Sequence, residues 1–151
     1  MTLHLDDLPV GSRFALDDLV LSEAQIIDFA RRFDAQPFHV DPAAAAAGPF
    51  GGLVASGLQT VSELVSRWVS AVMVRAAGLG SPAIEAIRFL QPVRPSRRYT
   101  ARAEVIGSRR SRRDPTQGVL TVLLELADSG TPVLTVEPII LIATRPGRTE
   151  K

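Results

Sequence analysis

Two residues that could exchange protons lie five positions apart in the first third of the chain. Asp34 and His39 place a carboxylate and an imidazole on either side of Pro37, directly after a segment with helical spacing. Histidine changes its charge near neutral pH, which suits it to acid and base catalysis. The only other histidine, His4, lies in a polar amino-terminal segment, where an ordered site is not expected. Any histidine-based chemistry is therefore assigned to His39.

Two helices are expected around this pair, with a short third one between them. Ser22 and Gln25 have the spacing of a capping box, and the apolar residues that follow share one helical face until the chain reaches Pro37. Asp41 has the position of a cap for a second, short helix. A long apolar helix is then expected over about residues 53–75, because hydrophobic side chains recur there every three or four positions.

Beyond this helix the hydrophobic period changes from helical to alternating, which predicts strands. The expected strands are residues 14–21, 84–90, 99–106, 119–126 and 133–143. A turn at Asp17-Asp18 is expected within the first strand, and Ser129-Gly130 predicts a hairpin turn. Pro138 cannot donate to a ladder and so predicts an edge position or a bulge. The pattern indicates an α+β fold in which an antiparallel sheet curls around the long helix.

The composition is that of a soluble globular domain. The chain has 151 residues, 46% hydrophobic and 22% charged, and we expect one domain over residues 1–145 and a flexible tail over 146–151. A net charge of +1 argues against a nucleic-acid binder. The absence of cysteine excludes disulfides, thiolate zinc sites and a cysteine nucleophile. Without a signal peptide or a membrane-length apolar run, the cytoplasm is the expected location.

The stretch from Asp34 to Gly57 resembles the hydratase motif of MaoC-like dehydratases and R-specific enoyl-CoA hydratases, which have the hotdog fold. In the family an aspartate and a histidine flank the sequence Asn-Pro-hydrophobe, and here Asp34 and His39 flank Gln36-Pro37-Phe38. A helix that begins with an aspartate follows, and Ser56-Gly57 stands at the start of the central helix. Residues 89–95 and 130–134 also resemble segments of that family. The resemblance spans most of the chain and implies a single hotdog domain.

The resemblance implies reversible hydration of a 2-enoyl thioester to a 3-hydroxyacyl thioester. That reaction needs a base, an acid and a donor for the enolate oxygen. Asp34 and His39 can supply the first two, and the backbone N–H of Gly57 is the candidate donor. The substrate would be acyl-CoA or an acyl-carrier protein, whose pantetheine belongs to the substrate, so no separate cofactor and no metal are expected. At least a homodimer is also implied, since the fold leaves strand edges exposed.

Two residues depart from the family pattern, and each candidate has a structural alternative. Gln36 stands where many members have asparagine, and Ser56 where many have histidine. Both are candidate substrate contacts, and these changes bear on substrate preference; the longer Gln36 could also orient Asp34 differently. Asp34 and His39 could instead be a helix cap and a surface histidine. Gly57 could allow close helix packing, and Ser56 could be only a cap.

The strongest local charge is the run from Arg109 to Arg113. The structural interpretation is a solvated hairpin tip. The functional one is that Arg109 and Arg110, together with Arg94, attract the phosphates of coenzyme A or an acidic carrier protein. Nucleic acid ranks below both, because few aromatic residues are available to stack on bases.

Two other functions remain open at this point. One is a non-catalytic thioester-binding or structural subunit that needs a partner hotdog chain. The other is a hotdog thioesterase, in which a carboxylate activates water against the thioester carbonyl. The Asp34/His39 spacing favours the hydratase over both.

Overall fold

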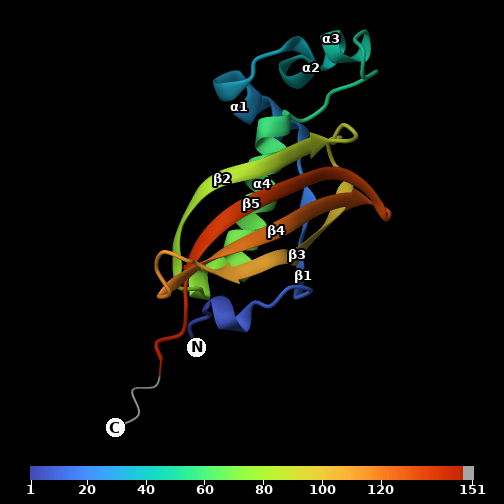
Figure 1. Ribbon diagram of the computed structural model, residues 1–151. Helices are drawn as coiled ribbons and strands as arrows, with labels where there is room; N and C mark the ends of the chain where they lie inside the picture. Colours follow the sequence, from blue (N-terminus) through green and yellow to red (C-terminus); the bar gives the residue numbers. More distant parts are fainter. Residues whose placement is uncertain (148–151) are drawn as a thin grey trace.

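An antiparallel sheet that curls around one long helix forms the body of the protein (Figure 1). The computed structural model describes residues 1–147, so residues 148–151 of the expected tail lie outside the described residues. In chain order the elements are η1 (Leu5–Asp7), β1 (Arg13–Val20), α1 (Glu23–Phe33), α2 (Pro37–Val40), α3 (Pro42–Ala46), α4 (Gly57–Ala71), η2 (Met73–Arg75), β2 (Gly78–Phe89), β3 (Arg98–Arg110), β4 (Gln117–Asp128) and β5 (Thr131–Ala143). The expected α+β architecture is confirmed.

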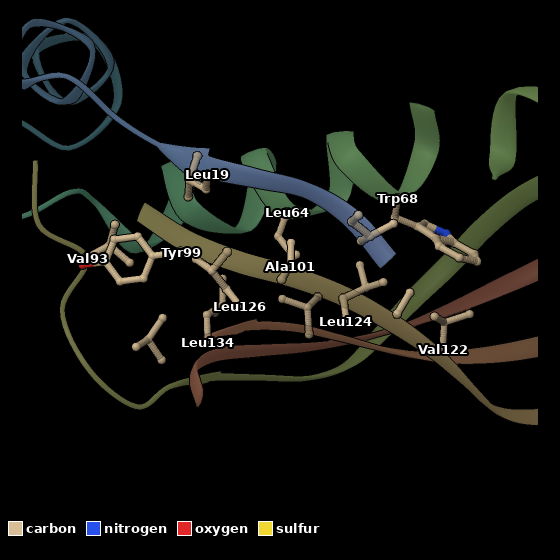
Figure 2. Close-up of a cluster of buried hydrophobic side chains, with 14 of the residues drawn as sticks. Leu19, Leu64, Trp68, Val93, Tyr99, Ala101, Val122, Leu124, Leu126 and Leu134 are labelled. Atoms are coloured by element: carbon tan, nitrogen blue, oxygen red, sulfur yellow. The ribbon is translucent and has the colours of Figure 1, made fainter. Parts of the chain in front are cut away.

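The core lies between α4 and the concave face of the sheet. The strand order is β1-β3-β4-β5-β2, and α4 packs mainly against β1, β3, β4 and β5. Leu64 and Trp68 of α4 are almost fully buried, and the Trp68 indole meets Phe14 of β1 edge to face. Figure 2 shows α4 side chains facing Tyr99, Leu124 and other residues of the sheet. The helix is therefore fixed against the sheet, and its first turn has a defined position.

The helix α1 forms as its sequence predicts. The Ser22 hydroxyl accepts a hydrogen bond from the backbone N–H of Gln25, and the Gln25 side chain accepts one from the backbone N–H of Ser22. Ile26 and Ala30 occupy the buried face of this helix. This capping box satisfies two N–H groups that the first helical turn would otherwise leave unpaired.

The helix α4 begins four residues later than expected. Residues 53–55 are buried but not helical: Val54 donates its N–H to Phe38 and Ala55 donates its N–H to Val93. Those two bonds tie the segment to α2 and to the loop after β2. The expected start at residue 53 is therefore wrong, and Gly57 is the first helical residue.

One strand expectation, the turn at Asp17-Asp18, is wrong, and the one for Pro138 is confirmed in one of its two forms. β1 runs through Asp17 and Asp18 without a turn, and only its pairing register with β3 shifts between Leu16 and Leu19. Pro138 lies in β5, which is an interior strand, but the register with β2 shifts beside it, so a bulge and not an edge accommodates the proline. Ser129, with its positive φ, helps to form the expected hairpin turn.

No helix among residues 1–147 is long and apolar enough to span a membrane.

Candidate active site

A cavity of about 510 Å³ lies at the amino-terminal end of α4. It is lined by four of the predicted site residues, Asp34, Gln36, His39 and Gly57. Its remaining walls are largely apolar: Phe50, Ala55, Leu58, Thr60, Phe89, Leu90, Gln91, Pro92, Val93, Val133 and Leu134. The fold thus gathers residues from three distant parts of the chain around the predicted catalytic pair.

The turn between α1 and α2 sets the positions of Asp34 and His39. Asp34 ends α1, with its N–H donated to the carbonyl of Ala30. Pro37 occupies the first position of α2, where its fixed φ suits a helix and its missing N–H is not needed. The single turn of α2 then carries His39 back towards Asp34. Five positions in sequence become one contact in space.

Both ring nitrogens of His39 have defined neighbours. Nδ1 lies 2.6 Å from the carbonyl oxygen of Val54, and Nε2 lies 3.3 Å from Oδ2 of Asp34. A carbonyl can only accept, so the neutral ring carries its hydrogen on Nδ1 and keeps a lone pair on Nε2. The residue is only 6% exposed, so this is a buried, oriented imidazole and not a surface histidine.

The carboxylate of Asp34 is held by two donors. Gln36 Nε2 donates to Oδ1 at 2.7 Å, and the Ser56 hydroxyl donates to Oδ2 at 2.7 Å. These two bonds, Gln36 first, lower the pKa of Asp34 below its ordinary value; burial acts in the opposite direction, and His39 lowers it further. Asp34 therefore stays ionised beside the imidazole at neutral pH.

Ser56 is the N-cap residue of α4, yet its side chain does not cap the helix. Its hydroxyl is fully buried and donates to Asp34 instead. Within residues 1–147, no protein acceptor takes the backbone N–H of Gly57. An unpaired N–H at the positive end of a helix dipole, on a residue that lines a cavity, can bind a developing oxyanion.

The aromatic ring of Phe89 lies directly against Gly57. A Cβ placed on Gly57 would lie 2.5 Å from a ring carbon of Phe89, closer than side-chain atoms pack. Glycine is therefore needed for this close approach, as the structural interpretation of Gly57 proposed. Gly57 also lines the cavity, so the packing and catalytic interpretations are compatible.

The structure places Arg94 beside the cavity, with its guanidinium already bonded. Nη2 donates to the carbonyl of Phe50 at 2.6 Å, and Nη1 donates more weakly to that of Gly52 at 3.4 Å. Arg94 thereby braces the loop that brings Phe50 to the cavity wall. A direct contact between Arg94 and substrate remains a prediction.

Arg109 and Arg110 are not brought to the cavity. They lie at the far end of β3, in the hairpin at the opposite end of the sheet from α1–α3 (Figure 1). Arg110 forms an ion pair with Asp6. A role in binding the phosphates of a substrate remains a prediction, and within one chain the length of β3 separates these residues from the catalytic pair.

Two functional features were not identified from the sequence. The Val54 carbonyl that orients His39 belongs to a segment expected to be helical. The cavity walls from residues 89–93 and 133–134 lie in stretches whose family resemblance was noted without assigning them to the site. That resemblance was the available signal, since strand-end residues that meet across a sheet share no local pattern.

Comparison with known proteins identifies relatives of the whole domain. The family described as "MaoC like domain" matches residues 8–126. The uncharacterized protein YdeM of Bacillus subtilis is 31% identical over 122 residues, which are 81% of this chain and 85% of that protein. The 3-hydroxyacyl-thioester dehydratase Z of Mycobacterium tuberculosis is 30% identical over 71% of this chain and 72% of its own length.

A solved structure agrees with the fold. The MaoC-like dehydratase from Rhodospirillum rubrum superposes with a TM-score of 0.88 at 30% identity, covering 96% of this chain and 99% of that one. The matched region contains Asp34, His39 and the start of α4. This chain belongs to the MaoC-like dehydratase family and has its hotdog fold.

Proposed function

We propose that this protein is a hydratase/dehydratase that interconverts 2-enoyl and 3-hydroxyacyl thioesters of coenzyme A or a carrier protein. The observation that carries the proposal is the buried His39, whose Nε2 lies 3.3 Å from Oδ2 of Asp34 in a cavity that Gly57 also lines. Family membership and the 3-hydroxyacyl-thioester dehydratase relative support the reaction class.

In the hydration direction, His39 acts as the base. Nε2 takes a proton from water while the water oxygen bonds to C3 of the enoyl group, and the π electrons move onto the thioester oxygen as an enolate. The imidazolium then returns that proton to C2, which restores the neutral ring. One proton moves twice, so the protein ends each cycle as it began.

Asp34 stabilises the imidazolium formed in the first step. Its two oxygens already accept hydrogen bonds from Gln36 and Ser56, and its lowered pKa makes it a weak base. A fixed negative charge 3.3 Å from Nε2 favours the protonated ring when it forms. The pair therefore activates water together, with the imidazole carrying the proton.

The enolate oxygen would be held by the N–H of Gly57. The first turn of α4 has no side-chain cap, so this donor is available without breaking a bond of the resting protein. The apolar walls formed by Phe50, Phe89 and Leu90 would exclude water from the acyl group.

The direct test is turnover of enoyl-CoA substrates of increasing chain length. Purified protein is mixed with crotonyl-CoA and longer enoyl-CoAs, and we expect the absorbance of the conjugated thioester to fall as water adds. A thiol reagent in a parallel reaction reports hydrolysis. Thiol release without loss of the double bond would indicate a thioesterase, and neither signal at any chain length would indicate a binding subunit; both contradict the proposal.

We also propose that two copies pair along β2. This strand forms one edge of the sheet, and nearly all of its residues are exposed, including Leu79, Ile84, Ile87 and Phe89. A long apolar edge strand left unpaired would promote aggregation. Pairing with the same strand of a second copy would satisfy its free backbone groups and bury its apolar side chains. Because Phe89 also lines the cavity, this pairing would place both active sites near the interface.

A charge on this edge is expected to separate the copies. Ile87→Lys should lower the mass measured by light scattering from that of a dimer to that of a monomer. The substitution would bury a charged side chain in the interface between the two copies. Val20→Lys is the matched control, since Val20 is similarly exposed but lies on β1 at the other edge. A monomeric parent, or dissociation by the Val20 variant alone, would exclude the β2 interface.

A further inference from the structure

Gln36 has an unusual place in the cavity because its side chain turns back on the residue two positions before it. It is the N-cap residue of α2, but its side chain does not cap that helix. Instead, Nε2 donates to Oδ1 of Asp34 at 2.7 Å, and the Gln36 backbone N–H donates to the Asp34 carbonyl at 2.8 Å. Two bonds therefore join the same two residues.

The bond to Oδ1 helps to fix the plane in which Asp34 presents its carboxylate to His39. Ser56 and His39 both lie on the Oδ2 side, at 2.7 and 3.3 Å. Without a donor on Oδ1, the carboxylate could turn about its last bond and move an oxygen away from Ser56 and His39, since this torsion is broad. With Gln36 and Ser56 on opposite oxygens, one orientation is fixed.

We propose that Gln36 is a positioning residue of this active site, which holds the Asp34 carboxylate oriented towards His39 and does not bind the substrate. The inference rests on the proposed function, because it assigns Gln36 a part in the same proton transfer. It replaces the substrate contact expected from the sequence with a contact to the catalytic carboxylate.

The length of the glutamine side chain matters for this role. With the backbone unchanged, asparagine would withdraw the amide by one carbon–carbon bond from an oxygen that Gln36 reaches at 2.7 Å. An asparagine at this position would need a different turn between α1 and α2 to make the same bond. Gln36 and the local backbone are therefore matched in this chain.

The sign of the electrostatic effect follows from the bond. A donor to a carboxylate favours its charged form, and the Gln36 bond is the largest contribution that lowers the pKa of Asp34. Removing the donor raises this pKa towards its ordinary value. In a variant without this donor, Asp34 is therefore protonated at a higher pH than in the parent. Once protonated, Asp34 no longer stabilises the His39 imidazolium by its charge.

The test is a carboxyl carbon NMR titration of Asp34, which needs no turnover. It compares the parent with Gln36→Met, which has similar length and no donor, over about pH 3 to pH 7. We expect a higher midpoint for Asp34 in Gln36→Met. Gln91→Met is the matched control, because Gln91 lines the same cavity without bonding Asp34, and its Asp34 midpoint should equal that of the parent.

Kinetics on an enoyl-CoA substrate distinguish positioning from substrate binding. Gln36→Met should lower kcat about tenfold with little change in KM, and shift the acidic limb of the kcat/KM profile to higher pH. An unchanged Asp34 midpoint would overturn the proposal, as would a rise in KM at constant kcat. A raised midpoint in a protein without turnover would support the role of Gln36 and contradict only the hydratase assignment.

Discussion

His39→Ala is expected to lower kcat for hydration of an enoyl thioester by ~10²–10⁴-fold, the usual contribution of a positioned acid or base. The variant lacks Nε2, the only group in the cavity that combines a free lone pair with an adjacent fixed anion. KM should change little, since the imidazole acts on water and not on the bound acyl group. Steady-state kinetics at saturating substrate measure the effect.

Two further variants separate chemistry from folding. His39→Asn keeps an amide N–H close to the position of Nδ1, so it can still donate to the Val54 carbonyl while lacking Nε2. Its kcat should fall as far as that of His39→Ala. His4→Ala removes the other histidine, which lies outside the cavity, and should retain full activity. Undiminished turnover in His39→Asn would remove His39 from the mechanism.

Removing the N–H of Gly57 is expected to lower kcat by ~10²–10³-fold, as loss of one oxyanion donor does in other enzymes. Gly57→Pro removes this N–H at the first helical position, where proline is well tolerated. Ser56, with φ −59° and ψ 137°, already has the backbone conformation that a residue before proline requires. The change should therefore be local.

The ring of Phe89 must be removed first, because it leaves no room for a Cβ at position 57. The comparison is thus between Gly57→Pro and Gly57→Ala, both made in a Phe89→Ala background. Both double variants add a Cβ at position 57, and only the proline variant lacks the donor; KM measures whether the two further ring carbons of proline obstruct binding of the substrate. Circular dichroism checks that both are folded. Equal kcat values in the two would exclude the Gly57 N–H as the enolate donor.

Local rules predicted the elements that carry their own signals. The Ser22/Gln25 capping box and the Ser129-Gly130 turn depend on residues within a few positions of each other, and both appear as expected. The long apolar helix was also identified, because its period extends over four turns. The same regularity misplaced its start, since residues 53–55 are as apolar as a buried helix but bond to Phe38 and Val93.

The part of the site that follows the family motif, from Asp34 to Gly57, could be predicted from the sequence. Asp34 and His39 were identified as a pair from spacing and family resemblance, and the structure brings them together. The hydrogen-bond acceptor of the Ser56 hydroxyl could not be predicted from neighbouring residues, because a serine at the start of a helix usually caps it. In the structure the acceptor is Asp34, 22 positions away in sequence. Arg109 shows the converse: its charge was evident from sequence, but not its distance from the cavity.

The uncapped start of α4 limits how this protein can be stabilised by engineering. Aspartate at an N-cap is among the commonest stabilising substitutions, since it satisfies the first N–H groups of a helix. At position 56 it would put a second carboxylate where a hydroxyl now donates to Asp34. Two like charges at that distance would force one of them to take up a proton. At position 56, a substitution that stabilises the helix is therefore expected to reduce turnover. Variants designed for higher thermal stability should leave Ser56 unchanged.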